Sequence, residues 1–312
     1  MTDARWRPTC DARALRARAS LYAAVRTYFA AQDVLEVSTP VLAAHGVTDP
    51  HIPCIPVAGH GYLQSSPEYH MKRLLAAGSG PIYQISHCFR DGEAGQRHNP
   101  EFTLLEWYRP GFDLSALIDD TLALLATQLS EPPVQRLRFR DVFARATGLD
   151  PMTATVDALR AAAGTDLPRD LDQAALVDYL MATRVEASLP ADTLTVISHY
   201  PGWAAALAET EADHDGALVA RRFELYYGAM ELANGYQELT DADQQAARFA
   251  GDNQRRAHLG LQAMPADPGL LAALEAGLPA CAGVALGLDR LLMCQLGRGD
   301  IRDVITFPHD RA

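Results

Sequence analysis

Two glutamates within residues 222–240 are the first candidates for chemistry. Glu231 and Glu238 stand seven positions apart, so a regular strand would place them on opposite faces. The Asn234-Gly235 pair between them predicts either a two-residue hairpin, with the glutamates facing each other, or a glycine bulge that brings both to one face. Like charges this close favour a cation between them, and Mg²⁺ suits carboxylates combined with phosphates. The alternative is two solvated glutamates on an edge strand.

Residues 89–110 carry a second group of reactive side chains. Two β-rich runs, 82–89 and 102–108, flank a loop rich in glycine, histidine and charge, which predicts a long hairpin. Such a hairpin presents Arg90 and Glu106 near a loop that can receive an anion. A guanidinium at a strand end can clamp a phosphate or a carboxylate through two parallel hydrogen bonds. The alternative is a surface hairpin with solvated charges.

Two further stretches place reactive residues at the start of a helix. Ser66-Pro67-Glu68 puts a capping residue, a proline and an acid where a helix predicted to run to about Ala77 begins. Helix capping alone would explain Glu68. Residues 281–297 predict a small-residue strand and then a helix with Arg290 in its first turn, where a cation opposes the helix dipole. A purely structural role is therefore disfavoured for Arg290.

The composition limits the class of protein. The chain has 312 residues, 48% of them hydrophobic, which is enough for one large domain or two modest ones. Its 27 basic and 39 acidic residues give a net charge of −12, the wrong sign for a protein that binds mainly by neutralising phosphates. With neither a run of about 20 apolar residues nor a signal sequence, we expect a cytoplasmic protein without a membrane partner. The five scattered cysteines predict reduced thiols.

Helices and strands along the rest of the chain must position these groups. Apolar residues at three- and four-residue spacing predict an amphipathic helix at 11–32, followed by a strand at 34–37. We interpret residues 131–192 as an insertion, because its patterning is weak and it contains two alanine-rich helical segments. The other predicted elements are a strand at 62–65, helices at 114–129, 156–163, 171–188 and 242–259, and a strand at 193–199.

Together these stretches resemble a known family. Arg90, followed by Asn-Pro-Glu-Phe-Thr from Asn99 and Glu-Trp-Tyr from Glu106, is similar to motif 2 of class II aminoacyl-tRNA synthetases, and within them to the lysyl branch. Residues 11–42 are similar to motif 1, the dimer element of that family, and residues 281–297 to motif 3. The resemblance implies an α+β fold with an antiparallel sheet flanked by helices, in a single catalytic domain over residues 1–312. It also implies a homodimer.

The resemblance further implies a reaction and the residues that carry it. Enzymes of this family use ATP to activate an amino acid as an adenylate, and Arg90 and Arg290 would offset the charge that develops. Substrate binding is implied for Ser66, Pro67, Glu68, Glu106, Tyr108, Glu238 and Ala285. Nucleotide binding is implied for Arg90, Asp91, Asn99, Glu231, Leu232, Gly287 and Arg290, with Mg²⁺ at Glu231 and Glu238.

We do not expect one domain of this family here, and this expectation limits which molecule can accept the activated amino acid. Lysyl-, aspartyl- and asparaginyl-tRNA synthetases carry an N-terminal barrel that reads the anticodon, whereas the motif 1 helix of this chain begins near residue 11. In this early start of the motif 1 helix and in its net negative charge, the chain resembles the stand-alone lysyl-type enzymes that attach (R)-β-lysine to translation elongation factor P. We therefore expect that protein as the partner, and no tRNA. The alternatives are a truncated enzyme that charges tRNA or a free small acceptor, and a non-catalytic regulatory relative.

Two positions depart from the family pattern. Motif 2 usually has Glu two places after its Arg, whereas this chain has Gly92 there and Glu93 beside it, so Glu93 is a candidate replacement. Motif 3 of the lysyl enzymes has Gly where this chain has Ala285. One added methyl group can change selectivity by roughly 1 kcal/mol. We interpret Ala285 as reshaping the pocket for a β-amino acid.

Overall fold

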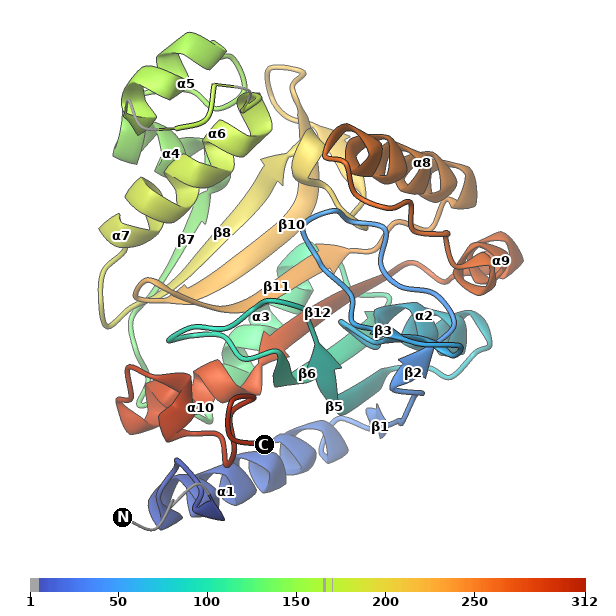
Figure 1. The fold of residues 1–312 in the computed structure, drawn as a ribbon, viewed down its shortest axis with the longest axis vertical. Coiled ribbons are helices and arrows are strands. Elements are labelled where there is room, and N and C mark those ends of the chain that lie inside the picture. Colours follow the sequence, from blue (N-terminus) through green and yellow to red (C-terminus); the bar gives the residue numbers. More distant parts are fainter. Residues whose placement is uncertain (1–5, 165–166, 170) are drawn as a thin grey trace.

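A nine-stranded sheet forms the centre of the molecule (Figure 1). The computed structural model describes residues 6–164, 167–169 and 171–312. Neighbouring strands are antiparallel, except that β1 pairs with β5 and β7 with β8 in parallel, which confirms the expected sheet type. In spatial order the strands are β1 Leu35–Glu36, β5 Ile82–Phe89, β6 Glu101–Pro110, β12 Cys281–Gly287, β11 Met230–Gln237, β10 Leu218–Tyr227, β8 Leu194–Pro201 and β7 Val134–Arg138, with β9 Thr210–Ala212 beside β10.

Helices flank this sheet, and a small second sheet lies at one end of it (Figure 1). The second sheet consists of β2 Leu42–Ala43, β4 Gly61–Leu63 and β3 Pro56–Val57. The helices outside the insertion are α1 Ala12–Ala30, α2 Glu68–Ala76, α3 Leu114–Ala126, α8 Ala242–His258, α9 Pro268–Gly277 and α10 Leu288–Leu296. The sequence analysis predicted most of these helices but not α9, whose N-terminus is capped by the carboxylate of Asp267.

The alternation of side chains along β6 decides what faces the site. Leu105 and Trp107 are fully buried in a core shared with α1, α3 and α10. Because successive strand residues point to opposite faces, Glu106 and Tyr108 face the other side of the sheet. A shift of one residue would expose Trp107 and bury the wrong set of side chains, so the apolar face fixes the register of the strand. The register in turn fixes the two polar side chains.

The turn between β10 and β11 differs from the sequence prediction. β11 Met230–Gln237 runs straight through Asn234-Gly235, and the chain reverses instead at Gly228, whose φ is +56°. Gly235 serves close packing rather than a turn, since a Cβ there would lie 2.4 Å from the ring of Phe223. A bulge does occur, but at Leu232: Leu225 pairs with Ala233, whereas Tyr226 pairs with Glu231. The predicted Asn-Gly hairpin is therefore wrong.

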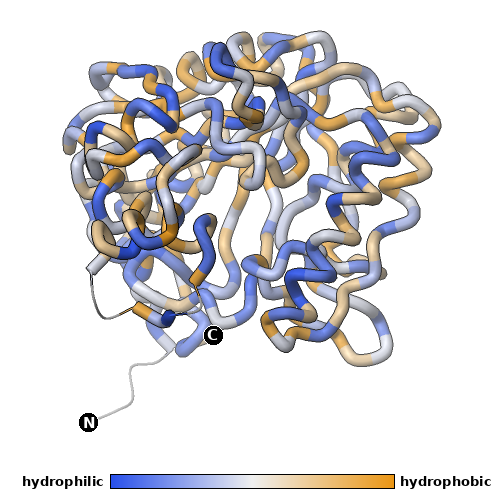
Figure 2. The backbone as a smooth tube through the Cα atoms, turned by 90° about the horizontal axis from the view of Figure 1, so that it is seen from above, coloured by the Kyte–Doolittle hydropathy of each residue, from blue (hydrophilic) through white to orange (hydrophobic). Residues whose placement is uncertain are grey.

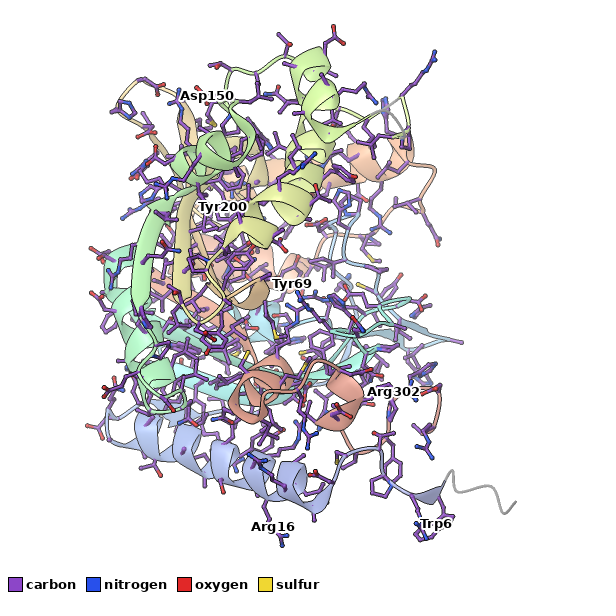
Figure 3. All side chains as sticks on the ribbon, turned by 90° about the vertical axis from the view of Figure 1, so that its left-hand side faces the viewer. Trp6, Arg16, Tyr69, Asp150, Tyr200 and Arg302 are labelled. Carbon is purple, nitrogen blue, oxygen red and sulfur yellow. The ribbon has the colours of Figure 1, made fainter. Side chains whose placement is uncertain are left out.

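The segment 131–192 is partly an insertion and partly sheet. Its first strand, β7, pairs with β8, which the sequence analysis did not predict. The helices that follow are α4 Phe139–Thr147, α5 Val156–Ala163, α6 Gln173–Leu180 and α7 Glu186–Ser188, with a π-helical turn at Met181–Val185. They share a core with the sheet, in which Tyr200 packs against Phe139 with ring centroids 4.6 Å apart. Figure 3 labels Tyr200 in this part of the molecule. These helices therefore rest directly on β8 and β10.

Apolar residues are distributed in short runs along the chain. Figure 2 shows polar and apolar segments alternating along the helices, as amphipathic helices require. Among the described residues, no helix is both long enough and apolar enough to cross a membrane.

Candidate active site

A cavity of about 330 Å³ opens on the face of the sheet that carries Glu106 and Tyr108. Its floor comes from β6, β10, β11 and β12, and its walls come from the start of α2 and from the loop at 43–54. This cavity brings together most of the residues for which substrate binding was implied. Of that set, the cavity is lined by Ser66, Glu68, Glu106, Tyr108, Glu238 and Ala285.

Glu106 is a buried carboxylate of the cavity that accepts a hydrogen bond on each of its two oxygens. The hydroxyl of Tyr108 donates to its Oε1 at 2.6 Å, and the hydroxyl of Ser66 donates to its Oε2 at 2.7 Å. Burial and the negative charge of Glu68 raise the pKa of Glu106 to about 7, although these two hydrogen bonds oppose the shift. Glu106 is therefore a preoriented acceptor that gains stability when a cation arrives.

Helix α2 begins at this pocket. Ser66 accepts a hydrogen bond from the backbone N–H of Glu68 at 3.1 Å, and Pro67 immediately precedes the first helical residue. Ser66 therefore both orients the helix start and holds Glu106. The helix begins one residue later than predicted, with Pro67 as its N-cap, so Ser66 satisfies the first helical N–H from the position before the cap, and Glu68 also lines the cavity. Pro67 itself is buried and does not line the cavity.

Lys72, one turn further along α2, is a site residue that the sequence analysis missed. Its side chain is 1% exposed, and its Nζ lies 2.6 Å from an oxygen of Glu68 and 2.6 Å from an oxygen of Glu238. The cation expected beside Glu238 is thus supplied by the protein. Spacing gave one usable signal, since Glu68 and Lys72 stand four apart on a helix, but that spacing is common on solvated helix faces.

Strand β12 is built of small residues because side chains of its neighbours cross it. A Cβ on Gly283 would lie 2.3 Å from the ring of Tyr108 and 2.6 Å from Oε1 of Glu238. Ala285 pairs with Glu106 of β6 and with Asn234 of β11, so its methyl group lies on the cavity floor between them. The sequence predicted a strand of small residues here, and at Gly283 the small size allows the close approach of two pocket side chains.

Arg90 lies at the end of β5, on the rim of the same cavity. Its guanidinium lies over the ring of Phe102, 5.1 Å from the centroid, and one nitrogen lies 3.5 Å from a carboxylate oxygen of Glu93. Its Nε is buried without a hydrogen-bond partner. A guanidinium with one unsatisfied buried N–H is prepared to receive an anion. Glu93 therefore lies beside Arg90, and its replacement of the usual motif 2 Glu stays a prediction.

Arg290 forms a second cationic centre at the other end of the site. Its Nη1 donates to the carbonyl of Glu231 at 2.9 Å and lies 3.3 Å from the carboxylate of the same residue. Its Nη2 lies 2.7 Å from Nε2 of His98, from the loop between β5 and β6. The loop between β5 and β6, strand β11 and helix α10 therefore meet at this guanidinium.

The acidic pair of this region is not the one expected from the sequence. Glu231 and Glu238 lie on one continuous strand, so their Cα atoms are on the order of 20 Å apart, and one metal ion cannot bridge them. The bulge at Leu232 turns Glu231 to the cavity face, towards Glu224 of β10. Burial and the charge of Glu224 raise the pKa of Glu231, even though its side chain is 39% exposed. The shared magnesium site at Glu231 and Glu238 is therefore wrong.

Glu224 and Glu231 fit a divalent cation better. The charge of Glu224 raises the pKa of Glu231, a repulsion that a metal ion would relieve, and carboxylates combined with phosphate oxygens are a ligand set suited to Mg²⁺. Glu224 also accepts hydrogen bonds from Arg222 at 2.5 Å and from the hydroxyl of Tyr200 at 2.6 Å, so it is held in place. The sequence analysis missed Glu224, although it lies in the same stretch, because no pattern separated it from other strand residues.

The other residues predicted to bind the nucleotide lie in different surroundings. Asn99 uses its side chain within the protein: its Nδ2 donates to the carbonyl of Glu101 at 2.6 Å, and its Oδ1 accepts from the N–H of His309 at 3.0 Å. Leu232 points into the core, 2% exposed, so only its backbone faces the site. Asp91 is exposed in the turn after β5, and Gly287 joins β12 to α10.

Comparison with known proteins agrees with this arrangement. Residues 5–311 match the family model for class II tRNA synthetases (D, K and N), so this chain belongs to that family. Among individual proteins, it is 45% identical to the elongation factor P–(R)-beta-lysine ligase of Pasteurella multocida (strain Pm70), over 98% of each chain. It is 44% identical, over 98% of each chain, to the protein of that name from Pseudoalteromonas translucida (strain TAC 125), and 45% identical, over 99% of each, to that from Klebsiella pneumoniae (strain 342).

Proposed function

We propose that this protein uses ATP to activate (R)-β-lysine as an adenylate and transfers it to a lysine side chain of translation elongation factor P. The names of its near full-length relatives support both substrates. The single observation that carries the proposal is the cavity itself, in which three acidic side chains from different elements converge. They are Glu68, Glu106 and Glu238. Acids clustered in one pocket suit an amino acid with two ammonium groups.

The reaction proceeds in two displacements. In the first, a carboxylate oxygen of the amino acid attacks the α-phosphorus of ATP, the bond to the bridging oxygen breaks, and pyrophosphate leaves with the electron pair. Arg90, at the cavity rim, orients the attacking carboxylate and the α-phosphate, because a guanidinium pairs with both. Arg290 offsets charge on the departing phosphates. Positioning supplies much of the acceleration in this type of reaction.

In the second displacement, the amine of the acceptor lysine attacks the carbonyl carbon of the mixed anhydride. An amide bond forms, the bond to the phosphate oxygen breaks, AMP leaves, and the amine loses a proton. The pocket holds the amino acid by its ammonium groups throughout, so the carbonyl stays exposed at the rim near Arg90. When bound, Mg²⁺ supplies charge neutralisation, and Glu224 and Glu231 would hold it.

The deciding experiment is intact-mass analysis of purified elongation factor P after incubation with this protein, ATP, Mg²⁺ and candidate amino acids. We expect a mass increase of one lysyl unit with (R)-β-lysine, and a smaller yield with α-lysine. A parallel reaction with bulk tRNA and radiolabelled amino acid tests the second candidate. Acid-precipitable label that ribonuclease removes, with no change in the mass of elongation factor P, would contradict the proposal.

We also propose that the protein is a homodimer, as the motif 1 resemblance implies. Leu35, Val41 and Leu42 are 57%, 40% and 44% exposed, and they follow α1 in one short segment. Exposed apolar side chains gathered in this way are typical of an interface. Sedimentation equilibrium of the purified protein would measure the mass in solution, and a monomer at micromolar concentration would contradict this proposal.

A further inference from the structure

Lys72 is a buried charge that the proposed reaction does not use directly. A buried ammonium is costly unless it is paired and hydrogen-bonded. Here two carboxylates at 2.6 Å, those of Glu68 and Glu238, keep it charged and raise its pKa. An arrangement this costly in a pocket wall calls for an explanation other than stability, because an apolar side chain would be cheaper there.

The charges of the pocket give that explanation. Three carboxylates, those of Glu68, Glu106 and Glu238, surround one internal ammonium, so the group has a net charge of −2 when all four are ionised. Arg222, a half-buried cation that lines the cavity, is balanced by Glu224 at 2.5 Å. A ligand with two ammonium groups would neutralise this group of four side chains, whereas one with a single ammonium group would leave one of its negative charges uncompensated.

Resting on the proposed function, we propose that Lys72 is a positioning and specificity residue that sets the pocket to receive a diamino acid. Its ammonium bridges the carboxylates of Glu68 and Glu238, which would otherwise repel each other. It opposes the rise in the pKa of Glu238 and holds both carboxylates at the cavity lining, so that each can accept a hydrogen bond from a ligand ammonium group. Without Lys72, Glu238 takes up a proton more readily and presents a donor where the ligand also presents a donor.

The titratable groups around Lys72 make the effect of removing its charge on substrate binding measurable. The titratable groups that face its ammonium are Glu68 on its own helix, Glu106 of β6, Glu238 beyond β11 and Cys281 of β12. Burial raises the pKa of Glu238 to about 8, and Lys72 opposes that shift. Removing the ammonium therefore raises the pKa of Glu238 further. Substrate affinity should then depend on pH over a range in which the wild-type pocket is less sensitive.

The test compares Lys72→Met with wild type and with Arg73→Met. The first removes the charge and keeps most of the stem; the control removes a charge from the same helix outside the cavity lining. In ATP–pyrophosphate exchange, we expect Lys72→Met to raise the KM for β-lysine about tenfold or more at pH 7, since a charged hydrogen bond contributes that much. The KM should fall towards the wild-type value between pH 7 and 9, with a smaller change in kcat. Arg73→Met should match wild type.

Two outcomes would overturn the role of Lys72: a wild-type KM and pH profile, or a loss that is equal at every pH and follows the melting temperature, as a packing role requires. If Lys72→Met does not fold, the double variant Lys72→Met/Glu238→Gln removes both partners. It should fold, bind substrate weakly and lack the new pH dependence. A double variant with wild-type KM would also overturn the proposal.

A separate binding measurement keeps this test independent of the enzymatic assignment. Calorimetry with 1,5-diaminopentane reports on the pocket without ATP or adenylate formation. Wild type should bind this dication at least about tenfold more tightly than it binds 1-aminopentane, and Lys72→Met should lose most of that preference at pH 7. If no amino acid supports pyrophosphate exchange but this preference is present, the proposed function fails and the role of Lys72 in diamine recognition stands. Equal binding of both amines by wild type contradicts the proposed role.

Discussion

Gly283 lies so close to Tyr108 that a Cβ at this position would come within 2.3 Å of the tyrosine ring. The same atom would lie 2.6 Å from Oε1 of Glu238. Both neighbours are buried and cannot retreat without disturbing Glu106 or Lys72. The absent side chain at Gly283 is therefore what allows the two substrate-facing groups to occupy one layer of the pocket.

We expect Gly283→Ala to lower pyrophosphate exchange by at least about tenfold and the free energy of unfolding by about 1 to 3 kcal/mol, because overpacking displaces both side chains. Gly299→Ala is the matched control, since a Cβ there meets nothing within 4 Å. Exchange kinetics and urea unfolding would be measured for both. A Gly283→Ala protein with wild-type KM would contradict the geometry described for this pocket.

The pKa of Glu106 predicts how stability changes with pH. It is raised from 4.5 to about 7, so the folded protein holds this proton more tightly than the unfolded chain does. The resulting stabilisation is complete below about pH 4.5 and is lost as the pH rises through 7, at most on the order of 3 kcal/mol. Glu106→Gln should therefore flatten the pH dependence of urea unfolding between pH 5 and 8. An unchanged slope would mean that Glu106 titrates in its ordinary range.

Substrate binding should follow the opposite trend, because only ionised Glu106 pairs well with an ammonium group. We expect the KM for the amino acid to fall as the pH rises through about 7. The measurement is pyrophosphate exchange from pH 5.5 to 8.5 at saturating ATP. A KM that is constant over this range would show that Glu106 is ionised throughout.

Arg290→Ala should reduce adenylate formation by about 100-fold or more, since this guanidinium offsets charge that develops in the transition state. The fold should persist, because Arg290 lies at the surface end of α10 and not in the core. Arg298→Ala, which breaks only the ion pair with Asp11, is the control. If the melting temperature of Arg290→Ala falls together with its activity, the role of this residue is structural.

Substitution of three glutamates should affect the magnesium requirement differently. Glu224→Gln and Glu231→Gln should each raise the Mg²⁺ concentration needed for half-maximal exchange by about tenfold, as loss of a metal ligand or its support does. Glu238→Gln should instead raise the KM for the amino acid and leave the Mg²⁺ requirement unchanged, because its partner is Lys72. A shifted Mg²⁺ requirement in Glu238→Gln alone would restore the assignment made from the sequence.

The helices and strands of this protein could be predicted from the sequence better than the contacts between individual side chains. The hairpin that carries Arg90 and Glu106, and the strand and helix before Arg290, were predictable because each is marked by local signals such as alternation, proline and helix capping. Whether Glu231 faces Glu224 or Glu238 depends on a bulge at Leu232, and nothing in the local sequence marks that bulge. The pairing of β11 with β10 in the folded protein therefore decides which glutamate Glu231 faces.

Lys72 and Gly283 illustrate the same limit. Lysine four residues after glutamate on a helix is ordinarily a solvated pair, and only burial against Glu238 makes Lys72 part of the site. Gly283 was recognisable as a small residue in a strand, but the groups that require its size come from β6 and from the end of β11. The roles of Lys72 and Gly283 therefore depend on contacts between segments that are distant in the sequence.

The last prediction concerns Ala285, whose methyl group lies on the cavity floor beside Glu106 and Asn234. α-Lysine carries an amine on the carbon next to the carboxylate, so this wall must retreat to admit it. The β-isomer holds that amine one carbon further away. Ala285→Gly should therefore raise the kcat/KM for α-lysine relative to β-lysine by about fivefold, which corresponds to roughly 1 kcal/mol for one methyl group.

Pyrophosphate exchange with each amino acid, for wild type and Ala285→Gly, gives the preference ratio directly. Ala282→Gly is a useful control, because Ala282 is fully buried in the same strand but belongs to the core behind the sheet, so its loss should lower stability without changing the ratio. The methyl group of Ala285 does not determine substrate choice if the ratio is the same in wild type and Ala285→Gly. In that case the selectivity must come from polar side chains of the cavity lining, such as those of Glu68, Tyr108 and Asn234.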